Sequence, residues 1–218
     1  MKKFLSISVV MSAVLMMGSC GGNNKKVPFD NGDSLNIAAV DPTVYGVCGD
    51  GTTMNMLQVI TDTGDTLMLN IEEAQKEGRV LGGIETGDRM AVVPNDKRTE
   101  ALIVVNQATL LGNWVMPNPL DGSDEVGISI KEGGIVEGID QSSLIYKTWR
   151  LVNGQLELVM VREGGSELDE TYLYDIDKLT SDSLIFHDAD DIYQYGRQGK
   201  KVEYGTEIEL EEAENFKI

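Results

Sequence analysis

The sequence predicts an all-β protein made of two barrels, a small one followed by one of eight antiparallel strands. Apolar and polar residues alternate over many short runs, as in Val126–Lys131, which places one face of each run against a core and the other in solvent. Glycine is frequent, at 24 of 218 residues, and turn-forming residues separate the runs. Asn153-Gly154, between two such runs, is typical of a two-residue type I′ hairpin.

The first twenty residues have the order of a secretory signal. Two lysines follow Met1, residues 4–17 are almost wholly apolar, and the small residues Gly18 and Ser19 precede Cys20. An apolar stretch of about 14 residues is shorter than the roughly 20 that a membrane-spanning helix needs. The segment therefore favours a cleaved signal peptide over a permanent membrane span.

Met17-Gly18-Ser19-Cys20 resembles the lipobox of bacterial lipoproteins, with Met in place of Leu three residues before the cysteine. The resemblance implies that residues 1–19 are removed and that Cys20 is the lipid attachment residue. Two or three acyl chains would then anchor the protein in the cell envelope of a bacterium, outside the cytoplasm, with the outer membrane as the expected location. The alternative is an ordinary signal peptide cut near Ser19, which leaves Cys20 as a free thiol.

The composition is strongly acidic. Asp and Glu number 36 against 18 Lys and Arg, and the formal net charge is −18. Such a chain repels phosphate backbones and anionic headgroups, which excludes nucleic acid as a partner and adsorption to a membrane surface by charge. With Cys20 acylated, Cys48 has no partner for a disulfide, so the fold must hold by packing alone.

Residues 20–42, rich in Gly, Asn, Lys, Asp and Ser, predict a flexible tether, and residues 43–106 predict the small barrel. Its expected strands are 43–48, 54–60, 66–70, 89–93 and 101–105. A short helix at 72–77, ended by Gly78, separates the third strand from the fourth. Three strands, a helix and two strands is the order of an OB-type barrel, although an SH3-like barrel gives a similar pattern. A spacer or docking domain is the simplest role for it.

Residues 107–200 predict the larger barrel. Its expected strands are 110–115, 125–131, 134–139, 145–152, 156–162, 170–178, 183–188 and 192–197. Consecutive antiparallel strands joined by short turns form a meander, and eight of them can close into a barrel without exposed edges. Residues 201–218 are rich in glutamate and predict an acidic C-terminal tail.

Leu111-Gly112-Asn113-Trp114 opens the first of these eight strands and resembles the Gly-x-Trp motif of lipocalins. The segment as a whole resembles the lipocalin-like domains of envelope lipoproteins. The resemblance implies that Gly112 lets the chain turn into the first strand and that Trp114 closes the floor of the barrel. The segment is shorter than a full lipocalin, and no C-terminal helix follows Arg197.

Tyrosines at alternate positions form the candidate ligand-binding surface. Tyr172 and Tyr174 share one strand face, and Tyr193 and Tyr195 share another, so their rings can line a pocket and their hydroxyls can orient a ligand. Core packing is the alternative explanation for these tyrosines. We expect a non-catalytic, membrane-anchored lipoprotein whose barrel binds a small hydrophobic molecule or a glycan fragment. The alternative function is an envelope scaffold or interaction subunit that docks protein partners.

The sequence predicts neither an enzyme nor a metal or cofactor site. His187 is the only histidine, and it begins an acidic run, 187–191, that a solvated hairpin turn explains better than a calcium site, because EF-hand spacing is missing. Cys48 lies in an apolar strand without a nearby histidine, which is typical of an inert buried thiol.

Overall fold

The computed structural model describes residues 41–118, 122, 124–140, 143–162, 164 and 168–199. These residues all belong to one compact unit of the chain, residues 37–218. The predicted signal peptide, Cys20, the tether up to residue 40 and the acidic tail lie outside the described residues. Those assignments therefore remain predictions.

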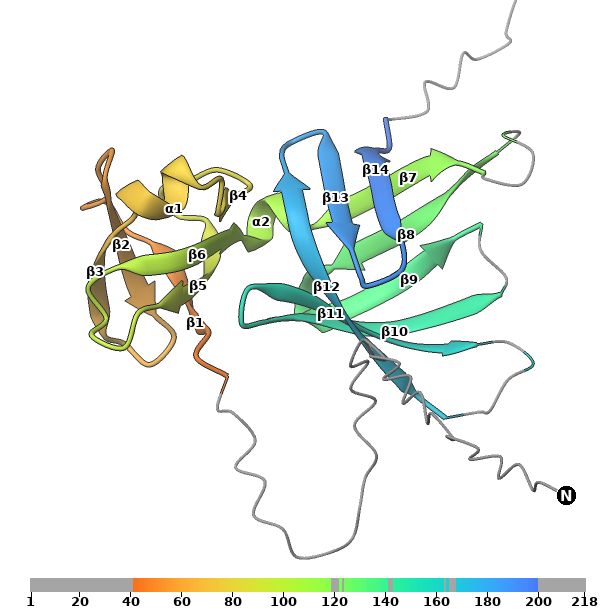
Figure 1. The fold of residues 1–218 in the computed structure, drawn as a ribbon, viewed down its shortest axis with the longest axis horizontal. Coiled ribbons are helices and arrows are strands. Elements are labelled where there is room, and N and C mark those ends of the chain that lie inside the picture. The colour runs from red at the N-terminus through yellow and green to blue at the C-terminus, as the bar shows by residue number, and fades with distance from the viewer. Residues whose placement is uncertain are drawn as a thin grey trace, which may run out of the picture. The chain divides into compact units, whose positions relative to one another are not determined.

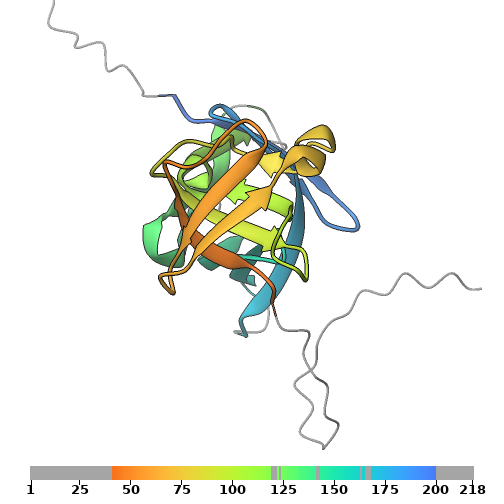
Figure 2. The same cartoon turned by 90° about the vertical axis from the view of Figure 1, so that its left-hand side faces the viewer.

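The first half of the described chain forms a six-stranded sheet. The strands are β1 (Val44–Cys48), β2 (Met56–Thr61), β3 (Thr66–Asn70), β4 (Val80–Leu81), β5 (Arg89–Pro94) and β6 (Ala101–Asn106), in the order β3-β2-β1-β5-β6-β4. The predicted short helix is α1 (Glu72–Lys76), which follows β3. Figure 2 looks onto this sheet, with its first strands in orange and α1 in yellow.

The pairing of this sheet fits the predicted small OB-like barrel. β1 pairs antiparallel with both β2 and β5. A parallel bridge between Asn70 and Glu100 joins the end of β3 to the start of β6. The last strand thereby returns beside the third, as it does in OB-type barrels. β4 was not predicted, because two residues are too short for alternation to show.

The second half forms a closed barrel of eight antiparallel strands, which confirms the predicted architecture (Figure 1). The strands are β7 (Gly112–Pro117), β8 (Glu125–Lys131), β9 (Ile135–Ile139), β10 (Leu144–Val152), β11 (Gln155–Arg162), β12 (Glu170–Leu179), β13 (Ser183–His187) and β14 (Ile192–Arg197). A 3-10 turn, η1 (Glu132–Gly134), joins β8 to β9, and helix α2 (Gln107–Leu110) links the sheet to the barrel. The last strand, β14, pairs with the first, β7, and closes the ring.

The turn between β10 and β11 has the predicted hairpin geometry. Asn153 has a φ of 51° and Gly154 a φ of 80°, so both central residues lie in the left-handed region that a type I′ turn requires. Asparagine tolerates this region better than other residues with a Cβ, and glycine adopts it without strain.

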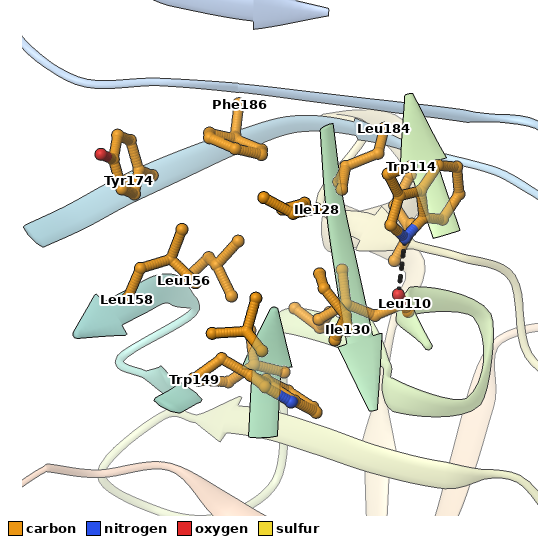
Figure 3. Packing of buried hydrophobic residues seen from close by; sticks show 14 of the residues in the cluster. Leu110, Trp114, Ile128, Ile130, Trp149, Leu156, Leu158, Tyr174, Leu184 and Phe186 are labelled. Carbon is orange, nitrogen blue, oxygen red and sulfur yellow. Dashed lines mark hydrogen bonds between the residues drawn. The ribbon is translucent and has the colours of Figure 1, made fainter. Parts of the chain in front are cut away.

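The barrel interior is packed with aliphatic and aromatic side chains from all eight strands. Figure 3 shows part of this core, in which Ile128, Ile130 and Leu156 converge between the strands. The same buried cluster includes Leu81, Ala91 and Val105 of the small sheet. A second buried cluster, which includes Cys48, forms the core of the small sheet. Within the described part of the chain, no helix has the length and apolar character needed to cross a membrane.

Candidate functional site

One end of the eight-stranded barrel is closed by side chains around Trp114. The indole is fully buried, and its Nε1 donates a hydrogen bond of 2.8 Å to the carbonyl of Leu110. The guanidinium of Arg197 lies over the indole, with Cζ 4.1 Å from the ring centroid. It also donates hydrogen bonds to the carbonyls of Leu111 and Thr109, at 2.8 and 2.6 Å. We call this the closed end.

At position 112, where the chain enters β7, only glycine fits without strain. Its φ of 129° lies in the region that favours glycine, and a Cβ built on it would overlap the guanidinium of Arg197. The glycine thus allows both the turn into the strand and the approach of the arginine to Trp114. The structure thus places the two residues of the predicted motif, Gly112 and Trp114, at the entry to β7 and in the buried floor of the barrel.

Sequence reasoning assigned no role to Arg197. The signal was nevertheless present, because a closed meander must pair its last strand with its first. In that pairing Arg197 lies directly opposite Trp114. A long cationic side chain facing a buried indole can contribute a cation–π contact and donate to exposed carbonyls.

The closed end is covered by residues from outside the barrel. Leu110 of α2 and Leu81, Ala91 and Val105 of the small sheet belong to the same buried cluster as Trp114. Apolar side chains therefore continue from the barrel core into the small sheet. The opposite end of the barrel lies away from this cover.

The four predicted tyrosines come together toward that opposite end. Tyr174 and Tyr195 are buried, whereas Tyr172 and Tyr193 are half-buried. Ring centroids lie 6.4 Å apart for Tyr172 and Tyr174, 5.6 Å for Tyr174 and Tyr193, and 5.3 to 5.6 Å from Phe186 to Tyr193 and Tyr195. Phe186, labelled with Tyr174 in Figure 3, thus connects the two tyrosine pairs.

Further half-buried side chains extend this aromatic surface. Met116 and Tyr146 pack against the same core. Met116 lies near the end of β7, the strand that begins at the closed end with Gly112. We call the surface formed by the five tyrosines, Tyr146, Tyr172, Tyr174, Tyr193 and Tyr195, the tyrosine end. Tyr146 was not among the predicted residues, because the β-bulge between Tyr146 and Thr148 interrupts the alternation of β10.

The tyrosine end is polar but uncharged. Burial raises the pKa of Tyr146 to about 12 and also raises the pKa values of Tyr174 and Tyr195. Burial, followed by the charges of Asp188 and Asp191, raises the pKa of Tyr193. These phenols are neutral at physiological pH, and acidic side chains lie around them.

His187 and Cys48 are the other candidate reactive side chains that the structure describes. His187 Nδ1 lies 2.8 Å from Asp177 Oδ2 on an exposed part of the surface. In the ranges that the structure describes, no three His, Cys, Asp or Glu side chains gather as a metal site would require. Cys48 is buried, with its Sγ 3.3 Å from Thr52 Oγ1.

Comparisons with known proteins concern the eight-stranded barrel. Residues 106–198 match the family model described as lipocalin-like, which shows a lipocalin-like domain in this part of the chain. The solved structure of a lipocalin-like protein from Bacteroides thetaiotaomicron VPI-5482 is similar to this chain, with 27% sequence identity. That match covers 41% of this chain and 97% of the other, with a TM-score of 0.38. No curated protein matches.

Proposed function

We propose that this protein is a lipoprotein of the bacterial envelope whose lipocalin-like domain binds a small, neutral, largely apolar molecule at the tyrosine end. A lipocalin-like domain suggests binding rather than catalysis. The observation that carries the proposal is the aromatic cluster itself. Tyr146, Tyr172 and Tyr193 of this cluster are half-buried at one end of a closed barrel, and the small sheet covers the other end.

The lining of the tyrosine end favours an uncharged ligand. Rings provide apolar contact area, and neutral hydroxyls supply hydrogen bonds that fix orientation. The hydroxyl of Tyr172 already donates to the carboxylate of Glu170, and Asp188 and Asp191 lie close enough to Tyr193 to raise its pKa. These carboxylates outnumber the one guanidinium beside Tyr172, that of Arg162, and so disfavour an anionic ligand such as a free fatty acid. Aliphatic side chains such as Met116 lie beside the rings, which favours an apolar molecule over a glycan fragment.

Binding can be tested with the neutral fluorescent probe N-phenyl-1-naphthylamine. We expect saturable fluorescence enhancement that Tyr193→Ala weakens by about 3- to 10-fold, as expected for the loss of one ring contact. The matched control is Leu173→Ala, which removes an exposed apolar side chain from the outer face of β12. Enhancement that does not saturate, or that the two variants reduce equally, would contradict binding at the tyrosine end.

Anchoring rests on the sequence of residues 17–20 and is tested separately. We expect the natural chain to partition into the detergent phase and the Cys20→Ser variant to move to the aqueous phase, because acyl chains supply about 0.8 kcal/mol per buried methylene. Mass spectrometry of the membrane-extracted protein would show the added lipid. A Cys20→Ser protein that still partitions entirely with lipid would refute lipid anchoring.

Docking of envelope protein partners, the alternative raised by the sequence, has no specific observation in its favour. It remains a sequence-based expectation, as does the lack of catalytic activity.

A further inference from the structure

A cavity of about 540 Å³ lies on the outer side of the closed end, where the small sheet meets the larger barrel. Its walls include Tyr45 and Arg89 of the small sheet, Gln107 of α2, Glu132 of η1, and Trp149 and Arg150 of β10. None of these residues belongs to the tyrosine end. The volume lies within the range of about 300–1,000 Å³ that is usual for small-molecule sites.

The two walls of this cavity are joined by hydrogen bonds. The hydroxyl of Tyr45 donates to the carbonyl of Leu151, and the backbone N–H of Asn153 donates to Asp41 Oδ1 at 3.0 Å and to Thr43 Oγ1 at 2.8 Å. These bonds link the start of β1 to the β10–β11 hairpin. The cavity is therefore preformed, which lowers the entropic cost of binding.

The charges in the cavity disfavour an anionic occupant. Arg89 makes a two-pronged pair with Asp62, at 2.7 and 2.8 Å, and Arg150 makes one with Glu157, at 2.5 and 3.0 Å. Each guanidinium thus has its own carboxylate. Glu132 adds a further negative charge, so an anion finds no unpaired cation among the described residues of the wall. The exposed carboxylate of Glu132 can instead accept hydrogen bonds from a neutral donor.

Two side chains of the cavity wall offer planar polar groups to a ligand. Gln107 is half-buried and Glu132 is exposed, and neither side chain makes a hydrogen bond to a described residue, so the amide and the carboxylate can bond a ligand. By contrast, Tyr45 and Trp149 donate their polar hydrogens to the carbonyls of Leu151 and Lys131. Their rings consequently offer only apolar surface, most of it from the half-buried Tyr45, because Trp149 is 8% exposed.

We propose that this cavity binds a neutral carbohydrate of one or two sugar units. Planar amide and carboxylate groups can each bond two neighbouring sugar hydroxyls, and an aromatic ring packs against the C–H face of a sugar. The proposal does not depend on ligand binding at the tyrosine end, because the two sites share no residue and lie at opposite ends of the barrel.

Intrinsic fluorescence can report occupancy. The chain has two tryptophans, of which Trp114 is fully buried at the closed end and Trp149 lines the cavity. The full chain, kept in a detergent without a sugar headgroup, is titrated with glucose, galactose, N-acetylglucosamine and maltose. We expect a saturable change in emission with at least one of these sugars and no change when Trp149→Phe removes the reporter.

Two variants localise the effect. Ala108→Phe adds a ring to the cavity wall from an exposed position on α2 and should abolish the response. Gln107→Ala should weaken sugar affinity by about 5-fold or more, because a hydrogen-bonding amide is lost. Its matched control is Gln194→Ala on the outer face of β14, which should leave affinity unchanged. Unaltered melting temperatures would show that both variants fold.

Three results of the sugar titrations would overturn the proposal, and a fourth comes from Tyr193→Ala. These are the lack of a saturable response to all four sugars, a response that persists in Ala108→Phe, and tighter binding of sulfate or glucuronate than of the neutral sugars. Tyr193→Ala separates the two sites, since it should weaken probe binding at the tyrosine end and leave the sugar response intact. A sugar response lost in Tyr193→Ala would place the sugar in the barrel instead and refute the assignment to this cavity.

Discussion

Replacing Arg197 by methionine tests whether the guanidinium, and not apolar packing alone, holds the closed end together. Methionine keeps an unbranched, flexible side chain but removes the charge and every donor. The variant would leave the carbonyls of Thr109, Leu111 and Ser181 without their bonds from Arg197 and uncover one face of Trp114.

The expected loss follows from these contacts. A hydrogen bond to a charged group contributes about 1.5–3 kcal/mol, and a cation–π contact adds about 0.5–2 kcal/mol. The bonds share one side chain, so their contributions do not add in full. Burial lowers the pKa of Arg197, which shows that part of the gain is offset by desolvation of the charge. A net loss of about 2–4 kcal/mol is expected, which lowers the melting temperature by about 4–16 °C in a domain of this size.

The assay is thermal unfolding followed by circular dichroism at neutral pH. Arg150→Ala is the control, because the pair of Arg150 and Glu157 is solvent-exposed on the arginine side and should contribute less than about 1 kcal/mol. Arg197→Lys should fall between wild type and Arg197→Met, since lysine keeps the charge but lacks the planar fork. A melting temperature for Arg197→Met within about 2 °C of wild type, or equal losses at both arginines, would refute this account of the closed end.

Four further predictions concern other parts of the fold, each with its own assay. Gly154→Ala should lower the unfolding free energy by about 1 kcal/mol or more in urea titrations, because the φ of 80° at this position disfavours a Cβ and the added atom would overlap Ile103. An unchanged urea midpoint would contradict this. Because the pKa of Tyr195 is raised in the folded state, its neutral phenol should favour folding below about pH 10, and this contribution should be lost as the pH rises through the folded-state pKa. Alkaline unfolding, monitored by tyrosinate absorbance, should therefore shift to higher pH in Tyr195→Phe. A shift to lower pH would show the reverse linkage. The buried thiol of Cys48 should react with Ellman's reagent only after unfolding, whereas rapid reaction of the native protein would mean that β1 opens readily. Both barrels should unfold in one calorimetric transition because they share a buried cluster, and two separated transitions would show that the shared packing is weak.

Most of the fold could be predicted from the sequence because its signals are local. Alternation and turn residues lie within a few positions of each other, so runs such as Glu125–Lys131 and the Asn153-Gly154 turn are visible before any tertiary contact is known. Strand β4 escaped prediction because it exists only through its parallel pairing with β6. That pairing joins segments that are distant in the sequence, which composition does not show.

The candidate sites were less predictable, for the same physical reason. Alternation could place Tyr172 beside Tyr174 on one face, but only strand register brings them to Tyr193 through Phe186. The cavity beside the closed end was missed altogether. Its wall residues Tyr45, Gln107, Glu132 and Trp149 come from four separate segments, and each by itself looks like an ordinary surface or core residue.

The small sheet is more than a spacer, because it completes the larger barrel. Separating the two parts would expose the apolar side chains of Leu81, Ala91 and Val105, and the floor around Trp114 would lose its cover. The backbone N–H of Gly82 also donates to the carbonyl of Leu179, and the hydroxyl of Thr109 donates to the carbonyl of Gly82. The same packing that closes one end of the barrel creates the cavity on its outer side. A change in the small sheet should therefore affect the proposed sugar site directly and the tyrosine end only through barrel stability.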